Sequence, residues 1–356
     1  MNPRPLLLLS ALALVAASCG DDEGSGTEGT SGPDPVTITL LTHDSFTVSD
    51  GVLEAFTDET GIEVELLQGG DAGTVVNQAI LTKGAPQADV LFGIDSTFLS
   101  RALDEELFVA YEAEGSEEIP ADLVLDPRHR VTSIDYGDVC LNYDKAYFEG
   151  AGLAVPDSLE DLVDPAYADL LVVENAATSS PGLAFLFATV AEFGEDGWVD
   201  YWQGLVDNGV LVVDGWEEAY NSSFSGGGLS EGTRPLVVSY ASSPPVEVVY
   251  ADPPVTEPPT GVIEASCYRQ IEGAGILTGT EHEDEAGQLI DFLLSTTFQD
   301  DVPLSMFVFP VHPDATLPEV FVDHAAQPAE VLELPADDVD AHREEWIDAW
   351  TDLVVR

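Results

Sequence analysis

Short strand-type runs alternate with helix-type segments along this chain, and that order restricts the fold more than any other feature. Residues 36–42 and 62–68 have the pattern of strands, and residues 49–61 between them have that of a helix ended by glycine. A second helical pattern, residues 74–84, precedes residues 88–94, which are nearly all apolar, as in a buried parallel strand. Strand–helix–strand order with short links predicts βαβ units and an open parallel sheet.

The same alternation returns in the second half of the chain. Strand-type runs cover residues 135–144, 170–175, 210–215 and 234–243, and helical patterns cover residues 158–170, 179–194, 197–209, 281–295 and 340–355. A chain of 356 residues is long enough for about two domains. We therefore predict an α/β protein with two lobes. In the last helix, Trp346 and Trp350 have i, i+4 spacing, which indicates packing rather than recognition.

The charge balance excludes several partners. The chain has 10 Lys plus Arg against 67 Asp plus Glu, for a net charge of −57. Nucleic-acid binding needs a basic surface, and this composition leaves almost nothing to build one. Nucleic acids and anionic membrane surfaces are therefore poor partners. The hydrophobic fraction of 45% is high enough for a substantial core.

The first residues predict export. Residues 1–18 combine an early arginine, a short apolar run and small residues, as a secretory signal does. The end of this segment resembles a lipobox, so we expect Cys19 to be lipidated; ordinary signal cleavage nearby is the alternative. Residues 19–35 then form an acidic Gly/Ser-rich tether. These features place the folded body on the outer face of a membrane, in contact with the bilayer only through its lipid.

Two cysteines remain, Cys140 and Cys267, and both lie in strand-type runs. Disulfides persist outside the cytoplasm. We expect a bond between the two, with a pair of buried free thiols as the alternative.

The segments that follow the predicted strands are rich in Ser, Thr, Asp, Gly and aromatic residues. They are residues 40–46, 67–74, 93–97, 174–182, 213–220 and 238–245. In open α/β sheets, ligands bind outside the carboxyl ends of the strands. Aromatic faces together with carboxylates suit an organic cation, because a cation over a ring contributes about 0.5–2 kcal/mol.

No motif argues for an enzyme, a resident cofactor or a metal site. Residues 69–74, GGDAGT, lack the Gly-Lys-Ser/Thr of a phosphate loop, and the serine in residues 223–228 is not in a nucleophile elbow. The six histidines show no paired metal-ligand spacing. An exported, tethered, two-lobed protein with a cleft for a cation is typical of a transporter's solute receptor.

Several stretches in order resemble the periplasmic thiamine-binding proteins of ABC importers, within the type II periplasmic-binding-protein fold. They are THDSF, ADVLFGID, DYGDVCLNYDK, TSSPGL, DGWEEAY, SYASSP, FPV followed by TLP, and EEWIDAW. The resemblance implies thiamine or its phosphates as ligand, an ABC permease as partner and a monomer. It also implies one lobe of residues 36–138 with 273–330, another of 139–272 with 331–356, and hinge strands that carry the two cysteines.

Site residues follow from the same resemblance. Asp71 would receive the aminopyrimidine or balance the cation, and Trp216 and Tyr240 would form walls of the ring pocket. Ser179, Ser180 and Ser243 would suit the hydroxyethyl or phosphate end, since a helix N-terminus favours anions. His43 stands where the family tends to have Tyr, and Phe307 stands where it has Trp; both are expected to face the ligand.

Other solutes remain open in the same fold. A polyamine or another amine would suit the acidity. Ferric iron is disfavoured, because receptors for it present adjacent tyrosines and residues 239–243 offer one. An exported hydrolase that uses a carboxylate pair is the alternative from another class.

Overall fold

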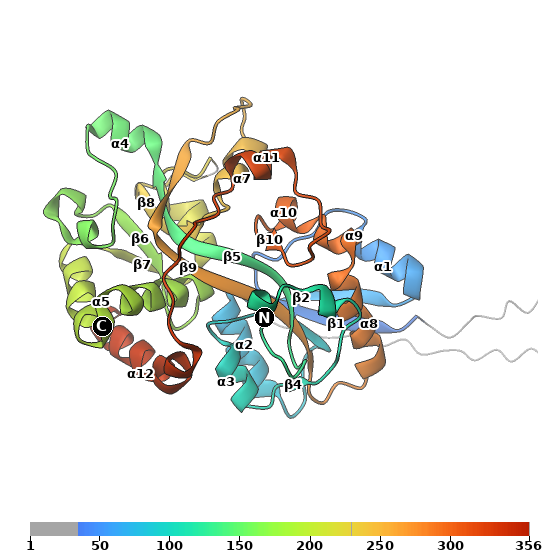
Figure 1. The fold of residues 1–356 in the computed structure, drawn as a ribbon. Coiled ribbons are helices and arrows are strands. Elements are labelled where there is room, and N and C mark those ends of the chain that lie inside the picture. Colours follow the sequence, from blue (N-terminus) through green and yellow to red (C-terminus); the bar gives the residue numbers. More distant parts are fainter. Residues whose placement is uncertain (1–34, 229, 356) are drawn as a thin grey trace, which may run out of the picture. The chain divides into compact units, whose positions relative to one another are not determined.

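The computed structural model describes residues 35–228 and 230–355. The predicted signal segment, Cys19 and the tether up to residue 34 lie outside the described residues. Within them, a ten-stranded sheet has the order β2–β1–β3–β9–β5–β8–β6–β7, with β10 beside β5 and β4 beside β9 (Figure 1). The strands are β1 (Thr37–Thr42), β2 (Glu63–Gln68), β3 (Val90–Asp95), β4 (Phe108–Val109), β5 (Thr132–Asp144), β6 (Leu171–Glu174), β7 (Leu211–Val213), β8 (Leu236–Tyr240), β9 (Thr260–Leu277) and β10 (Phe309–Pro310).

Helices connect most of these strands. They are α1 (Val52–Thr60), α2 (Ala72–Thr82), α3 (Leu99–Asp104), α4 (Lys145–Ala151), α5 (Ser180–Asp207), α6 (Trp216–Glu218), α7 (Pro244–Val249), α8 (Glu283–Leu294), α9 (Thr296–Gln299), α10 (Val302–Ser305), α11 (Glu319–His324) and α12 (Ala336–Val354). Short turns of other helix types are η1 (Ser116–Glu118), η2 (Ala121–Leu123), η3 (Glu160–Val163), η4 (Pro165–Tyr167) and η5 (Ala219–Ser223). In the part of the chain that the structure describes, no helix is both long and apolar enough to cross a membrane.

The sheet is parallel at its two ends and antiparallel in the middle. Strand β1 pairs in parallel with β2 and β3, and β6 pairs in parallel with β7 and β8. Between these groups, the long strands β5 and β9 pair antiparallel with each other. The βαβ prediction is confirmed at the ends of the sheet. The antiparallel centre arises because the chain crosses from one half to the other in β5 and returns in β9.

The two-sided burial of β3 explains why residues 88–94 are nearly all apolar. All six of its residues are buried. Val90 and Phe92 belong to the core that includes Phe56 of α1 and Leu289 of α8, whereas Leu91 belongs to the core that includes residues of α2. Both faces of the strand are therefore covered, which removes the polar alternation of a half-exposed strand.

Two predicted helical patterns differ in the structure. Residues 158–170 form only η3 and η4, because Pro165 has no N–H for a continuing helix and Asp164 caps the second turn instead. The patterns at 179–194 and 197–209 join into α5, with a break at Gly194, whose φ of 67° and ψ of 172° are not helical. The backbone at Gly194 adopts a region that side chains disfavour.

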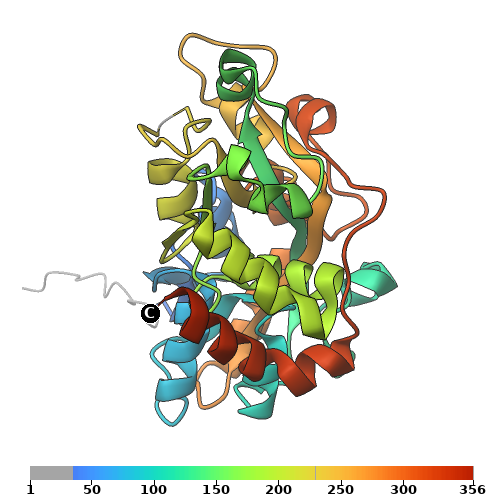
Figure 2. The ribbon, with the colours of Figure 1, turned by 90° about the vertical axis from the view of Figure 1, so that its left-hand side faces the viewer.

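Helix α12 packs against α5, as Figure 2 shows near the C-terminus. Trp350 is fully buried, and its ring meets that of Trp202 edge to face, with centroids 5.5 Å apart. Trp346 makes a similar contact with Phe187 at 5.8 Å. The two tryptophans of the last helix therefore serve packing, as their spacing predicted.

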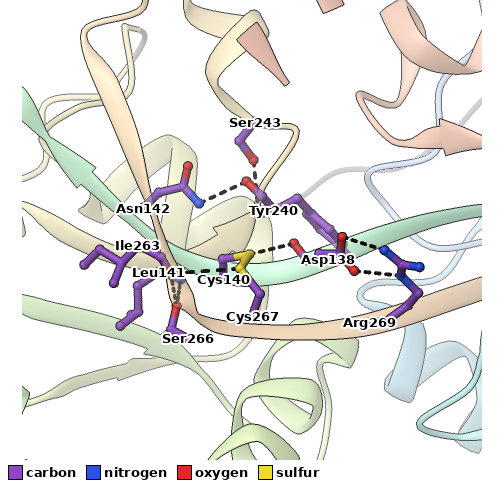
Figure 3. The surroundings of a disulfide bond; sticks show 10 residues. All are labelled: Asp138, Cys140, Leu141, Asn142, Tyr240, Ser243, Ile263, Ser266, Cys267 and Arg269. Carbon is purple, nitrogen blue, oxygen red and sulfur yellow. Dashed lines mark hydrogen bonds and ion pairs between the residues drawn. A yellow bond between two sulfur atoms is a disulfide. The ribbon is translucent and has the colours of Figure 1, made fainter. Parts of the chain in front are cut away.

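A disulfide between Cys140 and Cys267 joins the two crossing strands, with Cα atoms 4.2 Å apart (Figure 3). It lies at an irregularity in the pairing of β5 with β9. The Ser266 hydroxyl replaces the backbone hydrogen bonds that are missing at this irregularity. It accepts the N–H of Leu141 at 2.8 Å and donates to the carbonyl of Ile263 at 2.7 Å. The expected disulfide is present, and it fixes the centre of the sheet.

We expect the double variant Cys140→Ala and Cys267→Ala to lose about 2–5 kcal/mol of unfolding free energy, because the bond closes a long loop in the unfolded chain. The two cysteines are 127 residues apart in the sequence, so the disulfide closes a long loop. Urea denaturation measures the change. A reducing agent should lower the stability of the wild type to that of the variant and leave the variant unchanged; equal midpoints for the two proteins without reductant would contradict the prediction.

Candidate ligand-binding cavity

A cavity of about 270 Å³ lies where several strands end, close to the lower end of volumes found for small-molecule sites. Seven of the eight predicted binding residues line it, namely His43, Asp71, Ser180, Trp216, Tyr240, Ser243 and Phe307. The eighth, Ser179, is fully buried and is not among the lining residues. Its hydroxyl caps α5 by accepting the N–H of Gly182 at 3.4 Å. That these side chains bind a ligand stays a prediction.

Trp216 is held at the start of α6 by contacts on several sides. Its indole N–H donates to the Ser239 hydroxyl at 2.9 Å, and its backbone N–H donates to Asp71 at 3.0 Å. The ring of Tyr220 stacks on the indole, with centroids 5.1 Å apart and planes inclined by 16°. Because the indole also lines the cavity, a large aromatic surface is presented to it in a fixed orientation.

Tyr240 ends β8 and contributes a second aromatic wall. Its hydroxyl donates to the side-chain oxygen of Gln270 at 2.9 Å. The ring lies over Gly137, where a Cβ atom would come within 2.7 Å of the Tyr240 ring. Burial, followed by the neighbouring carboxylate of Glu272, raises the pKa of Tyr240 well above 10, so the phenol stays neutral and can donate.

Asp71 joins the first residues of three helices. Its carboxylate accepts the N–H groups of Ala72 at 2.7 Å, Ser180 at 3.3 Å and Trp216 at 3.0 Å, which begin α2, α5 and α6. A carboxylate is favourable at a helix N-terminus. Burial nevertheless raises the pKa of Asp71, against the opposing effects of the Trp216 N–H and of His43.

The N-terminus of α5 is therefore already occupied by an acceptor from the same chain. The sequence predicted that Ser179 and Ser180 would offer free N–H groups to a phosphate, but the Ser180 N–H is bonded to Asp71. Ser243 is similarly engaged, since its hydroxyl pairs with that of Ser239 at 2.8 Å and accepts the N–H of Tyr240 at 3.2 Å. These serines line a polar region whose hydrogen bonds are largely internal.

Three carboxyl groups form a row across neighbouring strands. On β9, Glu272 is paired with Asp95 of β3 on one side and with Asp135 of β5 on the other. Directly opposed residues of antiparallel strands share a face, and like charges there are destabilising. Burial raises the pKa of Asp95 to about 6, although Ser180 and Thr97 donate hydrogen bonds to it. Burial and then Glu272 raise the pKa of Asp135 well above 3.8.

His43 lies next to this row. One of its ring nitrogens, Nε2, is 3.4 Å from Oε1 of Glu272. Burial by itself lowers the pKa of His43, but the attraction of Glu272, Asp71 and Asp44 outweighs it and raises the pKa above 6.5. Protonated His43 is thus a counter-charge for Glu272.

Phe307 enters the cavity from the segment after α10 in an uncommon backbone conformation, with φ of 56°. Its ring centroid is 6.0 Å from that of Tyr250. Such left-handed conformations of large residues cost energy and concentrate at functional sites. A second cavity, also of about 270 Å³, shares Asn221, Val246 and Tyr250 with the first and adds Glu247 to its lining.

The cavity is acidic. Its charged lining residues are Asp71, Asp135, Glu217 and Glu272, with His43 as a base and no lysine or arginine. The nearby Arg269 is engaged elsewhere, because its guanidinium makes two hydrogen bonds to Asp138, at 2.8 and 3.0 Å. No cluster of metal-ligating side chains occurs among the described residues. The arrangement favours an aromatic or amino-bearing cation.

Residues 85–340 match the family of bacterial extracellular solute-binding proteins. The chain belongs to this family. It is 28% identical over 330 residues to the thiamine-binding periplasmic protein of Salmonella typhimurium, covering 90% of this chain and 94% of the relative. The protein of that name from Escherichia coli is 28% identical over 333 residues, with 90% and 94% covered.

Solved structures give the same fold. A periplasmic thiamin-binding protein matches with a TM-score of 0.77 at 26% identity, covering 90% of this solute-binding protein and 96% of that chain. Iron-bound HitA from Pseudomonas aeruginosa matches with a TM-score of 0.69 at 20% identity, with 90% and 99% covered. The two-lobed type II fold expected from the sequence is confirmed.

Three residues that line the cavity of this solute-binding protein were not predicted from the sequence, namely Asp135, Gln270 and Glu272. A signal was present: Gln270 and Glu272 alternate within a strand-type run, so both point to one face of β9. A carboxylate inside an otherwise apolar strand needs a partner or a function. What the sequence does not contain is the pairing that places Asp135 opposite Glu272.

Several buried groups have raised pKa values, so we expect the free energy of unfolding to increase as the solution is mildly acidified. Asp95, Asp135 and Glu174 are buried and hold protons more tightly when folded than when unfolded, and His43 acts in the same direction. Each extra proton bound by the folded state adds about 1.4 kcal/mol per pH unit. We expect the free energy of unfolding in urea to rise by about 1–3 kcal/mol from about pH 7.5 to about pH 5.

Glu174→Gln is the matched control for this pH dependence. Both carboxylate oxygens of Glu174 are buried without a hydrogen-bond partner, and burial raises its pKa well above 4.5. The variant should show a smaller rise, because one of the groups that takes up a proton is gone. A stability that falls between these two pH values would show that the buried carboxyl groups do not control it.

Proposed function

We propose that this solute-binding protein captures thiamine between its lobes and delivers it to the permease of an ABC importer. The observation that carries the proposal is the lining of one cavity by Trp216, Tyr240 and several carboxylates without lysine or arginine. Thiamine is a flat, positively charged heterocycle that carries an aminopyrimidine. A cation over an aromatic face contributes about 0.5–2 kcal/mol, and nearby carboxylates add attraction.

The relatives support this assignment. Two sequence relatives and one solved structure each cover about nine tenths of the chain, and all three are named as thiamine-binding proteins. The family transports solutes and works outside the cytoplasm. We further propose that the protein has no catalytic role, acts as a monomer and is anchored through lipidated Cys19. Residues 36–138 with 273–330, and 139–272 with 331–356, would form its two lobes.

Another amine is the second candidate. A polyamine would also be attracted by the acidic lining, and an unpartnered oxygen of Asp135 favours a ligand with N–H groups. Thiamine is favoured over it because a polyamine has no flat ring to use the aromatic walls. Ferric iron is less favoured, since the described residues contain no cluster of metal-ligating side chains.

Calorimetry with thiamine tests the proposal directly. We expect tight binding by the wild type and about a 30-fold or greater loss for Trp216→Ala, because the variant removes a ring face worth about 2 kcal/mol when desolvated. Trp216→Phe keeps an aromatic face and loses the indole hydrogen bond to Ser239, so it should bind between the two. The proposal fails if the wild type gives no heat with thiamine and no protection from thermal unfolding.

The charge of the cavity predicts selection against phosphorylated forms. Thiamine diphosphate brings several negative charges toward lining carboxylates, and the N–H of Ser180 is already bonded to Asp71. We expect the wild type to bind the diphosphate at least about tenfold more weakly than thiamine, with a smaller difference at high salt. Competition calorimetry at low and high ionic strength measures both quantities. Equal affinities at low salt would contradict this prediction without affecting the assignment of thiamine.

A further inference from the structure

One acceptor of a residue that lines the cavity has no partner in the part of the chain that the structure describes. Oδ2 of Asp135 is buried and makes no hydrogen bond with any described residue. The side chain is only 2% exposed, yet Asp135 is one of the residues that line the cavity. A buried carboxyl oxygen without a donor costs free energy, so its place at the cavity wall indicates that a ligand supplies the donor.

The neighbours of Asp135 concentrate negative charge at the same point. Glu272 is its direct partner on β9 and also lines the cavity, and Asp95 follows on the far side of Glu272. Asp95 is satisfied by donors from Thr97 and Ser180. His43 contacts Glu272 but does not reach the free oxygen of Asp135. A hydrogen bond between the Asp135 and Glu272 side chains contributes to the raised pKa of Asp135, and Oδ2 of Asp135 remains without a donor.

We propose that Asp135 and Glu272 together bind the amino group of the ligand's aminopyrimidine, an inference that rests on the proposed function. The pair supplies two adjacent carboxyl groups of residues that line the cavity, and Oδ2 of Asp135 has no hydrogen-bond partner among the described residues. Of the groups in thiamine, the amino group has N–H bonds to donate, whereas the charged thiazolium nitrogen has none. The aromatic surfaces of Trp216 and Tyr240 are then left for the ring faces.

This assignment differs from the one that the sequence suggested. Asp71 was expected to receive the aminopyrimidine, but its two oxygens already accept three backbone N–H groups. Those bonds fix the starts of three helices, and a ligand N–H would compete with them. Asp71 therefore positions Trp216, and the Asp135–Glu272 pair binds the amino group.

Comparison of thiamine with oxythiamine, which has an oxygen in place of the amino group, tests the inference. The wild type should prefer thiamine by about tenfold or more, because oxythiamine leaves a buried carboxyl oxygen without a donor. In Glu272→Gln and in Asp135→Leu the preference should shrink to about threefold or less, because the acceptor pair is broken. Pyrithiamine keeps the amino group and the positive charge, so its affinity should fall in parallel with that of thiamine.

Glu174→Gln is the matched control, because it removes a buried carboxylate that does not line the cavity. Its preference for thiamine over oxythiamine should equal that of the wild type. Circular dichroism and thermal unfolding check each variant, and either cavity variant suffices if the other fails to fold. If the wild type does not bind thiamine, the proposed function fails. If it binds thiamine without discriminating against oxythiamine, or if the cavity variants keep the wild-type preference, the inference about Asp135 and Glu272 is overturned.

Discussion

The antiparallel pairing of β5 with β9 determines where the chemistry of this protein is located. Two parallel groups of strands could fold side by side without forming a shared site. The long crossing strands bring them into one sheet, and their register places Asp135 opposite Glu272 and Gln270 opposite Gly137, where the Gln270 side chain accepts the Tyr240 hydroxyl. The disulfide between Cys140 and Cys267 holds the same two strands together at the irregularity in their ladder.

Electrostatic repulsion in the cavity is balanced in different ways at different carboxylates. Asp71 is neutralised in part by helix N-termini, Asp95 by hydroxyl and backbone donors, and Glu272 by His43. Oδ2 of Asp135 has no hydrogen-bond donor among the described residues. The proposed cationic or amino-bearing ligand would supply a donor that the described residues do not, which would be a physical basis for selectivity as well as for affinity.

Much of this arrangement could be predicted from the sequence, for identifiable reasons. Apolar periodicity and glycine positions indicated the βαβ units, and strand ends rich in aromatic and polar residues indicated where a ligand would bind. The family resemblance named Trp216 and Tyr240, and both line the cavity. The partners of those residues could not be predicted. Asp71 accepts the N–H groups of Ser180 and Trp216 because three helices start close together. Local sequence patterns do not indicate which helix ends will be neighbours.

The bonds of Asp71 to Ser180 and Trp216 cross the boundary between the two proposed lobes. They connect the start of α2 with the starts of α5 and α6, which are more than a hundred residues away along the chain. Any motion that separates α2 from α5 exposes the N–H groups of Ser180 and Trp216, and water must hydrate them as the carboxylate withdraws. If the proposed lobes separate to exchange the solute, opening would hydrate the N-terminal N–H groups of α5 and α6, and closure would dehydrate them again.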